Sequence, residues 1–182
     1  MALTTVAVLV GSLRADSIHR RLAEVAADVV PENVAVRLVD GLGELPLYNE
    51  DVDLAGAPEA VERLRRRLTD ADAIALFTPA NNGTVSAALK NAIDWASRPY
   101  GRSSFSGKPV AAVSAAHNTS TIIDHTLLAA SVAGGVPVSE ATATFALRDL
   151  AGVDLATDAR VRAELRRSLA GLVEKVPTSV AA

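Results

Sequence analysis

The chain has 182 residues, of which 49% are apolar and 21% charged, and its formal net charge is −3. This length fits one domain that buries roughly 70% of its unfolded surface, and the apolar content excludes a largely disordered chain. The lack of cysteine excludes disulfides, a thiolate nucleophile, and iron–sulfur or cysteine-ligated zinc sites. The acidic balance, 21 Asp and Glu against 18 Lys and Arg, and an aromatic content of 3% argue against a nucleic-acid-binding surface.

The first apolar run, residues 3–10, is too short to span a membrane, and no basic segment precedes it as in a signal peptide. We therefore expect a buried first strand, a cytoplasmic protein and no membrane partner. Residues 1–176 are expected to form a single domain, followed by a flexible tail over 177–182.

Five short apolar runs alternate with five helical patterns along the chain. Strands covered by helices on both faces are almost continuously apolar, which predicts strands over 6–10, 34–39, 73–77, 110–114 and 136–138. Apolar residues at helical spacing predict helices over 18–29, 61–68, 85–96, 123–130 and 161–172. Pro58 suits the first turn of the second helix, and Thr157 is the expected cap of the last one.

This alternation predicts an α/β protein with a parallel sheet and right-handed crossovers. About 180 residues and five strands favour a three-layer, flavodoxin-like, doubly wound five-stranded sheet of order 2-1-3-4-5. Such a sheet binds its ligand at the carboxyl ends of the strands, where the strand order reverses. The candidate site therefore comprises the loops after Val10, Phe77 and Val113.

The first loop carries groups that bind phosphate. Gly11 allows a tight turn off the strand, Ser12 and Ser17 offer hydroxyls, and Arg14 is a permanent cation. The helix that follows adds unpaired backbone N–H groups at its start. A plainer interpretation is equally open at this point, in which Ser17 only caps the helix and Arg14 is a solvated surface charge.

Other phosphate-dependent classes lack their signatures. No Gly-Lys-Ser/Thr follows the first strand, which disfavours a Walker A loop, and Gly41-Leu42-Gly43 lacks the third glycine of a dinucleotide fingerprint. A receiver domain shares the topology but needs acidic residues after the first and third strands. The chain has Gly11-Ser12 and Thr78-Pro79 there.

The second loop, residues 78–84, suits the edge of a flat heteroaromatic ring. Pro79 stiffens the exit from the strand, and Asn82-Gly83 turns the chain back while leaving amide groups directed into the crevice. In the helix beyond, Trp95 is better explained as core or subunit-interface packing. Lys90 and Asp94 are an ordinary helix-surface pair.

A hydrolase or a metal site is disfavoured. Asp124 and His125 are adjacent on a predicted helix and point about 100° apart, so they cannot readily form a triad with Ser114 or Ser120. No Gly-x-Ser-x-Gly elbow is present. His117 and His125 have no third ligand at metal spacing.

Three segments in chain order resemble one family. They are Gly-Ser-Leu-Arg at 11–14 with Ser17, Leu-Pro-Leu-Tyr-Asn-Glu-Asp at 45–51, and Leu-Lys-Asn-Ala-Ile-Asp-Trp-Ala-Ser-Arg-Pro at 89–99. They resemble the NADPH-dependent FMN reductase family, which includes flavodoxin-like quinone, chromate and azo-dye reductases, and the match covers most of residues 4–115. The resemblance implies a homodimer or homotetramer that binds FMN, takes hydride from NADPH or NADH, and passes it through flavin N5 to a small-molecule acceptor such as a quinone. The flavin would carry the chemistry, so no catalytic side chain is expected.

The resemblance also implies which residues bind the cofactor. Ser12, Arg14 and Ser17 would hold the phosphate, with His19 standing where the family often has an asparagine. The ring would lie against residues from two loops, namely Pro79, Ala80, Asn81, Asn82 and Gly83, with Ser114, His117 and Asn118 at its far edge.

Two loops depart from the family pattern. Pro-Ala-Asn-Asn at 79–82 replaces the usual Pro-Glu-Tyr-Asn, and the third loop, residues 114–121, lacks the usual glycines. Residues with a Cβ do not give the same close backbone approach to a ring. These departures leave two alternatives open: an enzyme adapted to a specialised biosynthetic reaction, and a non-catalytic flavin binder.

Overall fold

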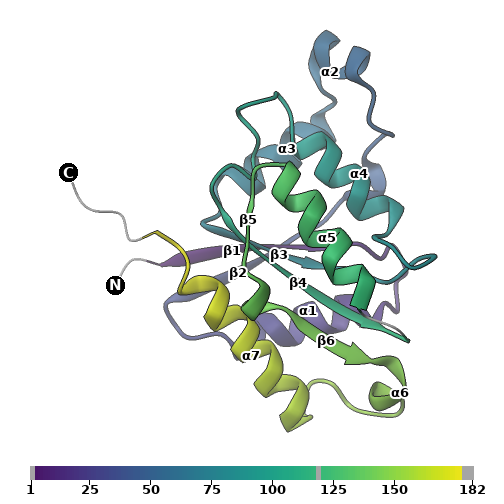
Figure 1. Cartoon of the computed structure of the whole chain (residues 1–182), viewed down its shortest axis with the longest axis vertical. Helices are drawn as coiled ribbons and strands as arrows, with labels where there is room; N and C mark the ends of the chain where they lie inside the picture. Colours follow the sequence, from purple (N-terminus) through teal and green to yellow (C-terminus); the bar gives the residue numbers. More distant parts are fainter. Residues whose placement is uncertain (1–2, 118–119, 178–182) are drawn as a thin grey trace.

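The protein is described by a computed structural model over residues 3–117 and 120–177, and Figure 1 shows a central sheet between two layers of helices. The predicted tail, apart from Pro177, lies outside the described residues. The strands are β1 (Thr4–Val10), β2 (Val34–Val39), β3 (Ala73–Phe77), β4 (Pro109–Ala116), β5 (Val136–Pro137) and β6 (Ala143–Ala146). All pairings are parallel and the strand order is β2-β1-β3-β4-β5, which confirms the predicted topology.

The helices follow the predicted rhythm with additions. They are α1 (Ile18–Val29), α2 (Glu50–Gly56), α3 (Glu59–Thr69), α4 (Ala87–Ala96), α5 (Ser120–Val132), α6 (Leu147–Leu150) and α7 (Ala159–Val173), with 3-10 turns η1 (Leu42–Glu44) and η2 (Ser139–Ala141). The short helices α2 and α6 are not among the predicted elements. No helix in the described part of the chain is both long and apolar enough to cross a membrane.

The fifth position of the sheet is built from two short strands. β5 pairs with the start of β4 at Pro109 and Val110, and β6 pairs with the end of β4 over residues 113–116. The prediction of one strand over 136–138 therefore missed β6. Because β6 extends the sheet beside the end of β4, it supports the edge where the ligand is expected.

Alternating side chains of β1 supply the two faces of the core. Val6, Val8 and Val10 are buried against α1 and α7, whereas Ala7 and Leu9 are buried against α3 and α4. Side chains of a strand alternate between its faces, so a continuously apolar strand packs against both helix layers at once. This explains why the apolar runs located the strands.

One predicted cap, one predicted first-turn residue and part of one helix face differ from expectation. Asp158, not Thr157, caps α7, since its carboxylate accepts the N–H of Val161 at 2.8 Å, while Thr157 bonds to Asp154. Pro58 stands at the cap position just before α3. Of the expected inner face of α5, Leu127 and Ala130 are buried as predicted, whereas Ile123 is half-buried and its neighbour Ile122 is fully buried.

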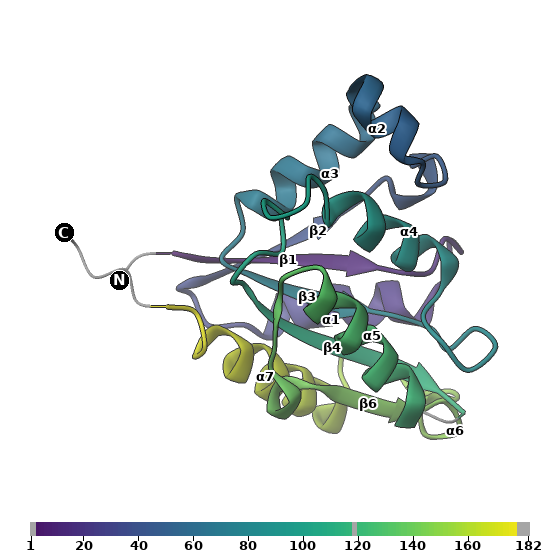
Figure 2. The same ribbon diagram turned by 45° about the horizontal axis from the view of Figure 1, so that its top comes forward.

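Residues 45–56 form an arm outside the sheet, and Figure 2 shows α2 projecting beyond α3 and α4. No residue of α2 is buried. Polar contacts hold the arm together with packing of Leu45 and Tyr48 against the core. Arg65 on α3 binds both carboxylate oxygens of Asp53 at 2.9 and 3.0 Å, and Trp95 donates its indole N–H to the carbonyl of Pro46 at 2.7 Å. Trp95 is fully buried, which confirms its interpretation as core packing.

Candidate functional site

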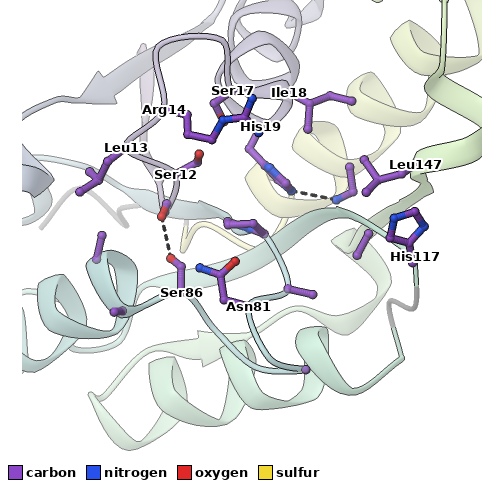
Figure 3. Close-up of a pocket in the computed structure, with 18 residues that line it drawn as sticks. Ser12, Leu13, Arg14, Ser17, Ile18, His19, Asn81, Ser86, His117 and Leu147 are labelled. Carbon is purple, nitrogen blue, oxygen red and sulfur yellow. Dashed lines mark hydrogen bonds between the residues drawn. The ribbon is translucent and has the colours of Figure 1, made fainter.

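A cavity of about 790 Å³ opens where β1, β3 and β4 end. Figure 3 shows side chains from the first loop, α1, the second loop and the end of β4 around it. Nine of the residues predicted to bind a ligand line the cavity, and they are Ser12, Arg14, Ser17, His19, Pro79, Ala80, Asn81, Gly83 and His117. Its volume is in the range of small-molecule sites.

The first loop and the start of α1 form one end of the cavity. Ser17 is buried and caps α1, because its hydroxyl oxygen accepts the N–H of Arg20 at 3.4 Å, and it still lines the cavity. The capping and ligand-facing interpretations of Ser17 are therefore compatible. Arg14 lines the same end and forms no ion pair with any described acidic residue. The start of a helix with an unpaired guanidinium beside it can bind an anion. We call this part of the cavity, formed by Ser12, Arg14, Ser17 and the first N–H groups of α1, the anion seat.

The start of α4 lies so close to Gly11 that no side chain fits at this position. A Cβ on Gly11 would lie 2.4 Å from the Ser86 hydroxyl oxygen and 3.0 Å from Cβ of Leu89. The Ser86 hydroxyl donates to the Gly11 carbonyl at 2.7 Å and also accepts the N–H of Leu89 to cap α4. Gly11 thus lets the end of β1 meet the start of α4, which closes the base of the cavity.

The second loop is a hydrogen-bonded hairpin. Asn81 and Thr84 exchange two backbone hydrogen bonds at 3.0 and 3.1 Å around Asn82 and Gly83, whose φ angles are 51° and 76°. Positive φ at both central residues defines a type I′ turn. Asn81 and Gly83 line the cavity, whereas Asn82, predicted to contact the ring, is exposed at the tip of the turn and is not a lining residue.

Helix α5 braces this hairpin from outside. Thr121 donates from its hydroxyl to the Gly83 carbonyl at 3.3 Å, and His125 Nδ1 lies 3.1 Å from the Thr84 hydroxyl. These contacts fix the loop although its residues 81–84 are exposed.

The third loop differs from expectation at one of its three predicted residues. Ser114 is fully buried, and its hydroxyl donates to the Thr78 carbonyl at 2.8 Å, so it ties β4 to the end of β3 and does not line the cavity. His117, the residue after β4, does line it, close to Leu147 at the start of α6 (Figure 3). Asn118 lies outside the described residues.

His19 bridges the two sides of the cavity. It projects from α1, is 3% exposed, and its Nε2 accepts the backbone N–H of Ala115 on β4 at 3.1 Å. Burial lowers the pKa of His19 to about 4. The ring is therefore neutral near pH 7 and carries its proton on Nδ1.

The hydrolase alternative with Ser114 is contradicted by the positions of its residues. The Ser114 hydroxyl is committed to Thr78 inside the sheet, while His125 lies on the outer side of the second loop against Thr84. Among the described residues, no three His, Cys, Asp or Glu side chains gather closely enough to hold a metal ion.

The charges of the cavity suit a phosphate-bearing ligand. Among the described residues that line the cavity, Arg14 is the charged side chain, His19 and His117 carry imidazoles, and none has a carboxylate. Uncharged walls from Pro79, Ala80 and the Ala115–Ala116 end of β4 lie beyond the anion seat. The residues present therefore fit a flat ring joined to a phosphate, as in FMN.

Sequence reasoning missed three lining residues that shape the site. Ser86 lies inside the predicted helix 85–96, but α4 begins only at Ala87 and Ser86 caps it, so a serine near the helix start was a cap signal that the prediction did not use. Ala115 and Leu147 offered none, because an alanine within a strand and a leucine in an unpredicted turn have no local mark of function.

The fold and cavity define a flavodoxin-like α/β protein with a ligand site at the switch point of its sheet. The family model described as NADPH-dependent FMN reductase matches residues 4–148. The chain belongs to the NADPH-dependent FMN reductase family.

Individual relatives agree with this assignment. A quinone reductase of Pseudomonas putida is 48% identical over 110 residues, 60% of this chain and 59% of the relative. A 2-hydroxy-1,4-benzoquinone reductase of Burkholderia sp is 43% identical over 108 residues, 59% of this chain and 58% of the relative. The chain thus spans less than two thirds of the length of these curated relatives. A solved structure, the flavoenzyme NAD(P)H:(acceptor) oxidoreductase FerB from Paracoccus denitrificans, superposes with a TM-score of 0.84 at 32% identity and covers 96% of this chain and 97% of that one.

Proposed function

We propose that this protein binds FMN in the cavity and reduces a quinone or another conjugated electrophile with NADPH or NADH. The observation that carries the proposal is the anion seat of Ser12, Arg14 and Ser17, which opens onto the same cavity as the hydrogen-bonded second loop. The family match and the two quinone reductase relatives support the choice of cofactor and acceptor.

The proposed contacts divide the cavity into two parts. Arg14, the Ser12 and Ser17 hydroxyls, His19 and the first N–H groups of α1 bind the phosphate, whose burial needs such compensation. The ring lies between the second loop, from Pro79 to Gly83, and His117. When bound, FMN supplies hydride transfer between the nicotinamide and the acceptor.

The protein's own contribution is placement. The hairpin bonds of Asn81 and Thr84 and the bracing by α5 hold one wall still, so the ring meets preformed polar groups. Pre-organised donors cost no rearrangement when the ligand binds. This requires no general base from the protein.

The altered third loop favours one second candidate, an enzyme of the same fold adapted to a specialised biosynthetic reaction. Ala115, Ala116 and His117 line the cavity where the family pattern is rich in glycine. Their Cβ atoms change the shape of the wall next to the ring. A screen of acceptors with the reduced protein distinguishes the candidates: rapid turnover of quinones supports the first, and turnover confined to another substrate supports the second.

A homodimer or homotetramer and a cytoplasmic location belong to the same proposal. Leu47, Leu54 and Tyr100 are 83%, 82% and 90% exposed in the single chain, and we propose that they lie in a subunit contact. Light scattering of the purified protein gives the number of subunits.

Two spectroscopic steps test the function. The absorption spectrum of protein mixed with FMN and passed through a desalting column should keep the flavin bands. Anaerobic addition of NADPH or NADH should then bleach them. Retained flavin that no nicotinamide bleaches would identify a non-catalytic binder, and loss of flavin on the column would refute the proposal.

A further inference from the structure

Strand β4 continues three residues beyond its last pairing with β3. That pairing joins Phe77 to Val113, and the N–H of Thr78 donates to the Val113 carbonyl at 2.9 Å. Backbone groups of successive residues in a strand point to alternate sides, so the N–H of Ala115 points to the same side as the Val113 carbonyl. On this side β3 has already ended. His19 Nε2 accepts this N–H, and its ring takes the place of the missing strand partner.

This bond determines what His19 offers to the cavity. With Nε2 as an acceptor, a neutral imidazole donates from Nδ1 alone. Nδ1 forms no hydrogen bond with a described residue and is not among the buried side-chain atoms of the described residues that lack a partner. His19 lines the cavity, and with Nε2 bound to Ala115, Nδ1 is the ring nitrogen left to face the anion seat.

Few charged side chains lie near the imidazole ring of His19. The other titratable side chains that line the cavity are Arg14, on the first loop, and His117, at the end of β4. On α1 itself, Arg20 is paired with Glu24 and Asp40. The lining residues from the second loop, α4 and α6 carry no charge.

We propose that His19 is a positioning residue that binds the ligand's phosphate as a neutral donor and at the same time holds the end of β4 against the anion seat. The inference rests on the proposed function, since it takes the phosphate to be that of FMN. An imidazolium would direct Nε2–H at the N–H of Ala115, two donors facing each other. His19 therefore stays neutral when the phosphate binds, and Arg14 with the start of α1 supplies the positive charge.

The first test uses nitrogen-15-labelled histidine in the ligand-free protein at pH 7.5. We expect the imidazole signals of the Nδ1–H tautomer, and we expect inorganic phosphate and FMN each to shift Nδ1 without protonating Nε2. Calorimetry of FMN binding in two buffers of different ionisation enthalpy should give about zero protons taken up. An imidazolium spectrum, or uptake approaching one proton, would overturn the inference.

Two variants separate the hydrogen-bond donor of His19 from its aromatic ring. Phenylalanine keeps a ring without a donor, and asparagine keeps a donor without a ring. His19→Phe should bind FMN about tenfold or more weakly, as expected for one hydrogen bond to a charged group, and should lose less affinity for riboflavin, which has no phosphate. His19→Asn should retain FMN binding within about threefold. Equal losses for FMN and riboflavin would show a merely structural role.

The outcomes also separate this inference from the proposed function. If phosphate shifts Nδ1 but FMN does not bind, the function fails and the anion contact stands. If FMN binds and is reduced while His19 becomes cationic, the function stands and the inference fails. If neither ligand perturbs His19, the inference fails.

Discussion

The carboxamide of Asn91 on α4 fixes the backbone at Tyr48, whose N–H donates to Asn91 Oδ1 at 2.8 Å. Asn91 Nδ2 donates in turn to the Pro46 carbonyl at 2.9 Å, and the Tyr48 ring meets Trp95 edge-on with centroids 5.0 Å apart. Residues 45–51 and 89–99, two of the three segments that carry the family resemblance, therefore form one structural unit that attaches the arm to the sheet.

This unit predicts the effect of Asn91→Leu. The change leaves the Tyr48 N–H without a partner, while the Pro46 carbonyl keeps the Trp95 indole N–H, and it should lower the free energy of unfolding by about 1–3 kcal/mol. Lys90→Ala, at the exposed pair with Asp94, is the matched control and should change stability by less than about 0.5 kcal/mol. Urea denaturation measures both, and equal losses would contradict the role of Asn91.

Gly11→Ala should destabilise the junction of β1 with α4. Its Cβ would be 2.4 Å from the Ser86 oxygen, and relieving such overpacking costs about 1–3 kcal/mol. In a Ser86→Ala background the loss should be smaller, because the obstructing oxygen is absent. Gly43→Ala, whose nearest contact would be 3.5 Å, is the control. Additive losses in the double variant would show that the two residues do not interact.

Arg14→Ala should weaken FMN binding by roughly 1.5–3 kcal/mol, the range for a hydrogen bond to a charged group. Riboflavin, which has no phosphate, should bind the variant and the original protein equally. Arg37→Ala on β2, an exposed arginine that does not line the cavity, should leave both affinities unchanged. Flavin fluorescence titration measures these constants, and an unchanged FMN affinity would exclude Arg14 from the site.

Burial of His19 makes stability depend on pH. Its pKa falls from 6.5 to about 4 in the folded protein, so the unfolded chain binds more protons between these values. The neutral ring therefore contributes its full stability above pH 6.5, and this contribution is lost as the pH falls towards 4, by about 3 kcal/mol in total. Unfolding free energies of the original protein and of His19→Asn should diverge at neutral pH and converge at pH 4. Parallel curves would contradict the assignment.

The sequence predicted the sheet order because each central strand is buried on both faces and is therefore visible as an unbroken apolar run. β6 has only Phe145 as a large apolar residue, and α2 buries no side chain, so neither has a periodic pattern. Both are stabilised by contacts distant in sequence, such as Arg65 with Asp53, which a local pattern cannot contain.

The position of the candidate site could also be predicted from the sequence, but the contacts within it could not. Topology brings together the ends of β1, β3 and β4, so the loops that line the cavity followed from strand order alone. The partners within the site did not: His19 and Ala115 are 96 residues apart, and the hydroxyl of Ser114 turned inward to Thr78 because β3 ends beside it.

A crystal structure of the protein with bound FMN locates the phosphate and the ring. We predict the phosphate at the start of α1, within hydrogen-bonding distance of Ser12, Arg14 and Ser17, and the ring between the second loop and His117. A flavin bound elsewhere, or in this cavity with its phosphate away from Arg14, would contradict this prediction.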